Sequence, residues 1–328
     1  MSQSTKRDDL LSEKQLGELL RSAGARPAPP ETMAQEVKLA VYEAWQDEVR
    51  RSRKVRNTRW LAFAASVTLA VSLGIFQLLP GTPDLVASLD EIVNQVEINT
   101  EDRWKVLTDE SLLTRDSTIR TGPDAYASLT LDSGMNVRID ENTVLSITDV
   151  NLINLNQGRI YVDSYGNNPV GEFLVKTIYG TATDIGTQFA VTTSQDGWHV
   201  QVREGSVVVQ DEEFKTTIND GIQISISDNG EFVTSDVTSN DPSWQWAEKV
   251  TPLFEIEGQS VERYLDWFSR ETGKQVTFRS ELARSAARST ILHGSIGGFQ
   301  PGESLGIVMS TTDFKLIEEN AGSVLIGK

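Results

Sequence analysis

The chain has 328 residues, of which 38% are hydrophobic and 23% charged, an ordinary composition for two or three globular domains. The absence of cysteine excludes disulfides, thiolate nucleophiles and zinc–thiolate sites, and two histidines, His199 and His293, disfavour a His-rich metal centre or a Ser-His-Asp relay. The formal net charge is −17, and the acidic excess lies beyond residue 59.

Residues 1–59 contain two predicted amphipathic helices. In the first, Leu16, Leu19 and Leu20 have helical spacing, and the proline-rich stretch "RPAPP" then ends the helix. In the second, Val37, Val41 and Trp45 follow one another at i, i+4 and i+8 on one face. Helices this short bury little surface on each other, so we expect these stripes to bind a protein partner. Pairing as a small hairpin, or lying on a membrane, is the alternative.

A charge-free run follows, from Trp60 to Leu79 in "TRWLAFAASVTLAVSLGIFQLLPG". About 20 residues at 1.5 Å rise cover a hydrocarbon layer of roughly 30 Å, so the run predicts a transmembrane helix over 60–79. A buried helix of a soluble domain is the alternative, and a cleavable signal is excluded because the run begins too far along the chain.

The direction of this expected span follows from a basic cluster before it. "RRSRKVRNTR" (50–59) precedes the span, and the next positive charge after it is Arg103. By the positive-inside rule, residues 1–59 are cytoplasmic and residues 81–328 are exported. Anionic lipid headgroups explain the basic cluster more simply than DNA does, so we expect no direct nucleic-acid contact.

From about Asp90 to Asp236 the apolar residues alternate with polar ones, and turn residues recur every eight to twelve positions. This pattern predicts an all-β domain over 80–240. A polar residue followed by glycine recurs at Gly158 and Gly205, each time before a β-branched run, which indicates stacked hairpins.

Two motifs in this region resemble catalytic or nucleotide-binding sites. "TATDIGTQFAV" (181–191) resembles the phosphate loop of actin-like and Hsp70-like ATPases, but no second phosphate loop follows it. "LTLDSG" (129–134) resembles an aspartic protease motif without a suitable second copy. Both therefore predict turns, with Asp184 accepting hydrogen bonds from the turn N–H groups. We expect no catalytic residue, metal site or cofactor, and thus no enzyme and no small-molecule substrate.

Residues 251–328 predict a small β-α-β domain of the α+β class. "LFEIEGQSVERYLDWFSRETGKQVTFRS" indicates strand, helix and strand, with Val261, Leu265 and Phe268 on one helical face. The rest of the segment repeats a strand, a helix over Leu305 to Thr311, and two strands.

The β segment resembles a known family. "VKTIYGTATDIGTQFAVTTSQDGWHVQVREGSVVV" (175–209) and "IRTGPDAYASLTLDSGMNVRIDENTVLSI" (119–147) are similar to the core of the FecR family. The positions that carry the resemblance are Gly180, Asp184, Gly186, Thr187, Phe189, Val191, Val202, Gly205 and Val207. The C-terminal segment is similar to the secretin and TonB N-terminal (STN) domain.

The resemblance implies a multi-domain fold class: a short α-helical cytoplasmic segment, one transmembrane helix, an all-β periplasmic FecR domain and a C-terminal STN-like domain. FecR proteins span the bacterial inner membrane once and carry a periplasmic signal to a sigma factor. The implied function is cell-surface signalling and transcription regulation as an anti-sigma factor. The implied partners are an extracytoplasmic-function sigma factor inside and a periplasmic or outer-membrane signalling protein outside, such as a TonB-dependent transducer.

The N-terminal segment departs from the family pattern, because it lacks the Trp-centred helical motif of the iron-uptake members. An iron or siderophore signal is therefore not implied. The rival hypothesis from another class is a membrane-anchored periplasmic scaffold that binds peptidoglycan or polysaccharide and has no sigma-factor partner. An exported hydrolase is a third hypothesis, but no Asp, Glu and Ser residues have a spacing that indicates a catalytic set.

Overall fold

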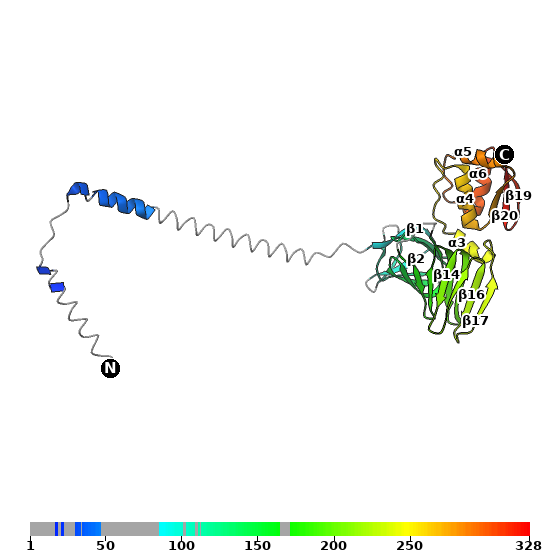
Figure 1. Ribbon diagram of the computed structural model, residues 1–328, viewed down its shortest axis with the longest axis horizontal. Coiled ribbons are helices and arrows are strands. Elements are labelled where there is room, and N and C mark those ends of the chain that lie inside the picture. The colour runs from blue at the N-terminus through cyan, green and yellow to red at the C-terminus, as the bar shows by residue number, and fades with distance from the viewer. Residues whose placement is uncertain are drawn as a thin grey trace. The chain divides into compact units, whose positions relative to one another are not determined.

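The computed structural model describes residues 17–18, 21–22, 30–33, 35–46, 85–100, 103–108, 111, 113–164 and 171–328. The chain divides into two compact units, Met1–Gly81 and Thr82–Lys328 (Figure 1). In the first unit, the described helical residues are 17–18, 21–22, 31–33 and 35–46. The second unit contains all the strands among the described residues, and its architecture determines the candidate site.

The fold class expected from the sequence is wrong in its transmembrane helix. No helix within the described ranges is long and apolar enough to cross a membrane. Helix α4 (Val261–Thr272), for example, has 12 residues, which makes it about 18 Å long against a hydrocarbon layer of about 30 Å. The residues of the expected span, 60–79, lie outside the described residues. The described chain is instead mostly β sheet with few helices.

Among the described residues, 17 strands form one large sheet. Their bounds are β1 Leu85–Val93, β2 Val96–Thr100, β3 Arg103–Val106, β4 Leu113–Thr114, β5 Ser117–Thr121, β6 Tyr126–Leu131, β7 Asn136–Ile139, β8 Val144–Asp149, β9 Leu152–Asp163, β10 Leu174–Lys176, β11 Thr181–Asp184, β12 Gln188–Ser194, β13 Gly197–Glu204, β14 Ser206–Gln210, β15 Lys215–Asn219, β16 Ile222–Ser227 and β17 Phe232–Asp236.

The sheet folds over on itself into two layers that share strand β9. Layer A runs in the order β4, β1, β6, β7, β9, β12, β13, β16, β17. Layer B runs β3, β2, β5, β8, β9, β10, β11, β14, β15. The two layers enclose one apolar core, to which most of the strands contribute alternate residues, such as Ile147 and Ile153 from layer B and Val137 and Val191 from layer A.

The chain passes between the layers at corners, and a glycine stands at several of them. Strand β9 pairs in layer B up to Gln157 and in layer A from Gly158 onwards. The links β11 to β12, β13 to β14 and β15 to β16 also change layer, at Gly186, Gly205 and Gly221. These four glycines have φ between +76° and +92°, a backbone conformation that residues with a side chain rarely adopt. The glycine repeat expected to mark hairpins thus marks changes of layer.

The C-terminal part of this unit is an α+β module. Its elements are α4 Val261–Thr272, β18 Gln275–Phe278, α5 Glu281–Ser289, α6 Pro301–Ser310, β19 Lys315–Glu319 and β20 Ser323–Gly327. The three strands form a separate sheet in the order β18, β20, β19, and β18 runs parallel to β20. Its apolar core includes Val261, Leu265 and Phe268 from α4, the helical face expected from the sequence. The strand expected before α4 is not formed, and α5 was not expected.

The segment that joins the two parts covers the outer face of layer A. It contains the short helices η1 (Pro242–Trp244) and α3 (Gln245–Glu248). Its side chains Trp244 and Trp246 are buried in a second apolar cluster against Tyr126, Tyr161 and Ala190 of layer A. Strands β7 and β12 and the second half of β9 are therefore covered on both faces.

The corner at Gly205 gives a test of this architecture. A Cβ added there would meet the carbonyl oxygen of Gly186 at 2.7 Å, whereas one added at Gly186 would meet nothing within 4 Å. Both residues have positive φ. We expect Gly186→Ala to cost about 1 kcal/mol from backbone strain alone, and Gly205→Ala about 2–4 kcal/mol because the corners must also move apart. Urea denaturation of the two variants measures this difference, and equal losses would contradict the stacked corners.

Candidate functional site

The predicted partner-binding stripe lies on a helix whose described residues are solvent-exposed as far as Trp45. Val37, Val41 and Trp45 have exposed fractions of 59%, 62% and 61%. The Trp45 ring lies beside the Tyr42 ring, with centroids 6.3 Å apart. The other half of the prediction, Leu16, Leu19 and Leu20, lies outside the described residues. Of the predicted surface, the described residues therefore include only Val37, Val41 and Trp45.

The family motif around residue 184 has a structural role. The hydroxyl of Thr187 donates a hydrogen bond to Asp184 Oδ1, and the backbone N–H groups of Gly186 and Thr187 donate to the same carboxylate. Burial raises the pKa of Asp184, and these hydrogen bonds oppose the rise. Because the turn N–H groups point at the chain's own carboxylate, they are not arranged to hold a phosphate.

The remaining motif positions surround this turn or the adjacent core. Gly205 lies against the turn, as described above, and Phe189 is fully buried in the core between the layers. Gly180 lies at the other end of β11, where a Cβ would meet the Gln210 carbonyl oxygen at 2.5 Å. Most of these positions therefore lie at the layer-changing corner or in the core beside it, whereas Gly180 lies at the far end of β11.

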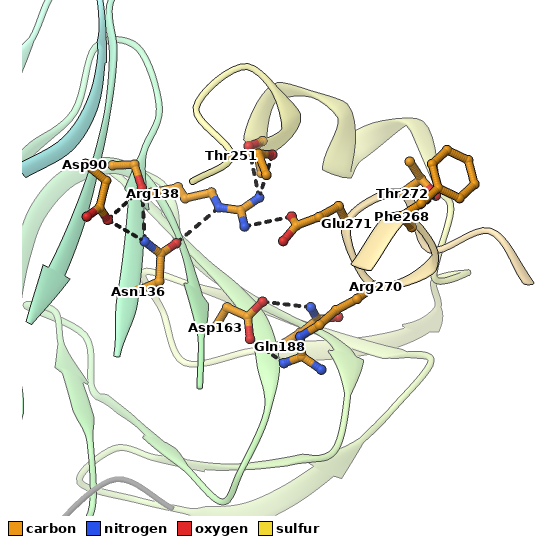
Figure 2. Close-up of polar contacts among 12 residues, drawn as sticks. Asp90, Asn136, Arg138, Asp163, Gln188, Thr251, Phe268, Arg270, Glu271 and Thr272 are labelled. Atoms are coloured by element: carbon orange, nitrogen blue, oxygen red, sulfur yellow. Dashed lines mark hydrogen bonds and ion pairs between the residues drawn. The ribbon is translucent and has the colours of Figure 1, made fainter. Parts of the chain in front are cut away.

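A second candidate site, which the sequence analysis missed, joins the C-terminal module to layer A (Figure 2). We call it the polar junction. Its members are Asp90, Asn136, Arg138, Asp163, Gln188, Arg203, Glu204, Arg270 and Glu271. Two of them, Arg270 and Glu271, are consecutive residues near the end of α4 and reach different strands of layer A.

The centre of the polar junction is the ion pair between Arg138 of β7 and Glu271 of α4. Arg138 Nη2 lies 2.7 Å from Glu271 Oε2, and both side chains have an exposed fraction of 0%. The same guanidinium donates from Nη1 to the Ala247 carbonyl oxygen at 3.1 Å and from Nε to Asn136 Oδ1 at 3.2 Å. One arginine thus contacts layer A, the joining segment and α4 together.

The strand side of this pair continues into a partly buried hydrogen-bond network. Asn136 Nδ2 donates to Asp90 Oδ2 at 2.9 Å, and the hydroxyl of Thr130 donates to the same oxygen at 2.7 Å. Burial raises the pKa of Asp90, while the hydrogen bonds from Thr130, Asn136 and Ser128 act in the opposite direction. The network fixes the orientation of Asn136 and so the position of the Arg138 side chain.

Arg270 makes the second contact of α4 with the sheet. It forms an ion pair with the fully buried Asp163 at the end of β9, and its Nη1 lies 3.0 Å from Glu204 Oε2 at the end of β13. Gln188 Nε2 donates to the other Asp163 oxygen at 2.9 Å. Burial alone would lower the pKa of Arg270, but the charges of Asp163 and Glu204 outweigh it and the pKa is raised. In one ion pair α4 supplies the anion, Glu271, and in the other it supplies the cation, Arg270. Reversing the helix would place like charges together, so the two pairs fix the direction in which α4 lies.

Backbone groups complete the polar junction. Arg203 Nε donates to the Ser239 carbonyl oxygen at 2.6 Å, and Arg203 Nη1 donates to the Glu271 carbonyl oxygen at 2.9 Å. Gly273, which ends α4 with φ +67°, is so close to the joining segment that a Cβ there would lie 1.9 Å from the Ser239 oxygen. The end of α4 therefore packs directly on the joining segment, with no room for a side chain.

Aromatic rings lie beside two arginines of the polar junction, Arg138 and Arg203, and beside the neighbouring Arg159. Arg138 lies over Tyr161 at 5.0 Å, Arg159 over Trp246 at 4.8 Å and Arg203 over Trp244 at 5.6 Å from the ring centroids. Such contacts favour a cation more strongly where water is excluded. The polar junction thus has a buried centre, at the Arg138–Glu271 ion pair and at Asp163, and is suited to holding two parts of the chain together rather than to binding a substrate.

The sequence contained a weak signal for this site. Arg138 alternates with Val137 and Ile139, so the period-two pattern places it on the opposite face of the strand, which is expected to be exposed. The alternating tryptophans of "SWQW" (243–246) were the sign that this outer face is covered. No group of three or more His, Cys, Asp or Glu that could hold a metal occurs among the residues described by the structure.

Comparisons with known proteins show a family similarity for part of the β region. The family model described as FecR protein matches residues 117–208, which confirms the resemblance for that part of the chain. No curated protein matched. Similarity of the C-terminal module to the STN domain is not shown by these comparisons, so it stays a prediction, as do the domain bounds 80–240 and 251–328.

Two solved structures resemble the chain, both described as a candidate anti-sigma factor from Parabacteroides distasonis, at 1.65 and 2.50 Å resolution. Each has 16% sequence identity to the chain and covers 64% of it. The matches cover 97% and 98% of the solved chains, with TM-scores of 0.36 and 0.35.

The buried ion pair predicts a large stability effect. Arg138→Met removes the guanidinium and leaves Glu271 charged in a dry site, so we expect a loss of about 3–5 kcal/mol. The control is Arg115→Met, whose ion pair with Asp149 has side chains 41% and 47% exposed, with an expected loss of about 0–1 kcal/mol. The double variant Arg138→Met, Glu271→Met should recover part of the loss. Urea denaturation measures all three, and similar losses for the two single variants would contradict a dry junction.

Proposed function

We propose that this chain is a regulator, not an enzyme, which binds an extracytoplasmic-function sigma factor through its N-terminal segment and receives a signal through the folded unit Thr82–Lys328. The observation that carries the proposal is the FecR match over residues 117–208. FecR proteins are sigma-factor regulators, and an anti-sigma role gives the exposed stripe of the N-terminal helix a partner.

The stripe has the chemistry of a helix that docks in a groove. Val37, Val41 and Trp45 lie on one face, and their exposure leaves the whole apolar stripe available to a partner. A large aromatic residue among smaller apolar ones is the usual composition of a binding hot spot. Leu16, Leu19 and Leu20 are the second proposed contact with the sigma factor.

The receiving end of the proposed relay is the C-terminal module, with a periplasmic or outer-membrane signalling protein, such as a TonB-dependent transducer, as its partner. The polar junction supports this role, because two ion pairs of opposite polarity hold α4 against layer A. A partner that displaces the module must move the β layers or break buried ion pairs, so the module does not move independently of the family-type β region.

Trp45→Ala is the direct test of the proposed sigma-factor contact. We expect affinity of the full chain for its sigma factor to fall about thirtyfold, equivalent to about 2 kcal/mol, because the variant removes the largest apolar group of the stripe. The helix should survive, since alanine has the higher helical propensity. Calorimetry measures the affinity, and circular dichroism measures the helicity.

The matched control is Leu39→Ala. Leu39 is as exposed as Trp45, at 63%, but lies on the opposite face of the helix, so its removal should leave the affinity unchanged. Equal effects of the two variants would mean that the stripe has no special role. Unchanged affinity in Trp45→Ala with unchanged helicity would move the search to Leu16, Leu19 and Leu20. No binding at all would favour the envelope scaffold.

The proposed location is the bacterial inner membrane, with residues 1–59 in the cytoplasm and the folded unit in the periplasm, as the basic cluster at 50–59 indicates. A reporter fused after Lys328 should be active if it functions only in the periplasm. A reporter that functions only in the cytoplasm should be inactive there, and its activity would overturn the proposed location.

A further inference from the structure

Strand β17 is an edge strand that nothing in the described part of the chain protects. It pairs with β16 on one side and with no other described strand. All five of its residues are exposed, so neither of its faces is covered. Protein sheets commonly protect such edges with lysine, proline, a bulge or a covering loop. The sequence "FVTSD" (232–236) contains neither lysine nor proline, and the pairing with β16 runs without a bulge.

The register shows which backbone groups point outwards. Ser227 N donates to the Glu231 carbonyl oxygen, and Val237 N donates to the Gly221 carbonyl oxygen. In an antiparallel pair the hydrogen-bonded positions alternate, so Val233 and Ser235 also point at β16. The N–H and C=O groups of Phe232, Thr234 and Asp236 therefore point away from the sheet and form the open edge.

The side chains along this edge combine apolar and acidic groups. Phe232 and Val233 have exposed fractions of 57% and 68%. The Phe232 ring stacks on Phe214 of the layer-B loop, with centroids 5.4 Å apart, and the two rings form an apolar platform beside the edge. Residues 216–248 include six Asp or Glu and no Lys or Arg. Asp228, Glu231 and Asp236 of this acidic stretch are exposed at or beside β17.

We propose that β17 is a docking edge for an extended segment of another protein, which adds to layer A as a further strand and alternates apolar with basic residues. The open backbone groups select an extended chain. The Phe232–Phe214 platform takes its apolar side chains, and the acidic surroundings select lysine or arginine. A second copy of this chain does not fit, because it would bring two acidic edges together in a protein of net charge −17. The inference does not depend on the sigma-factor contact.

The test uses the full chain and a fluorescein-labelled peptide, Arg-Val-Lys-Val-Thr-Val-Lys, with fluorescence anisotropy as the readout. Thr234→Pro removes an outward N–H without removing a hydrogen bond to β16, so it should fold and bind the peptide at least about tenfold more weakly. Thr234→Ala keeps the backbone and should bind as the wild type does. Raising the ionic strength from about 0.1 M to about 1 M shortens the Debye length from about 10 Å to about 3 Å and should weaken binding.

A second measurement holds even where Thr234→Pro disturbs folding. Peptide bound to the wild type should slow hydrogen exchange of the Phe232, Thr234 and Asp236 amides and leave those of Val233 and Ser235, already in the sheet, unchanged. Absence of binding, full affinity in Thr234→Pro with its fold intact, or equal binding of a peptide with glutamate in place of its three basic residues would each overturn the proposal.

Discussion

The buried ion pair between Arg138 and Glu271 constrains the structure more than any other contact described above. Two charges without access to water cost several kcal/mol each unless their geometry and their other hydrogen bonds are satisfied. Here the remaining donors of Arg138 reach Asn136 and the Ala247 carbonyl oxygen. An arrangement this demanding admits one orientation of α4, and the second ion pair, from Arg270 to Asp163, extends the same constraint to β9.

This pair is possible only because layer A is covered on both faces. The core between the layers covers the inner face, and Trp244 and Trp246 of the joining segment cover the outer one. A strand that is buried on both faces usually has a continuous apolar sequence. Asn136 and Arg138 of β7 depart from that pattern, and the departure is where the C-terminal module attaches. The polar residues in an otherwise buried strand thus mark the contact between the two parts.

Much of the fold was readable from local pattern. Alternation predicted the strands from residue 90 to 236, and the spacing of Val261, Leu265 and Phe268 predicted the buried face of α4. The hydrogen bonds that the sequence predicted from backbone N–H groups to Asp184 are present in the structure. The polar junction was not predictable in the same way, because its partners, such as Arg138 and Glu271, lie 133 positions apart, and no local period reports a contact at that separation. The layer changes at Gly158 and Gly205 were missed for a related reason. A glycine before a β-branched run is the same sequence pattern whether the chain forms a hairpin or passes to the other layer.

The sharing of β9 by both layers has a mechanical consequence. One half of this strand is hydrogen-bonded into layer B and the other half into layer A, so the layers cannot shear past each other without breaking the strand in the middle. The β region therefore responds to a load at its surface as a stiff body that shifts or tilts as a whole. A displacement applied through Asp163, the last residue of β9, acts directly on layer A, and the continuous strand carries it into layer B.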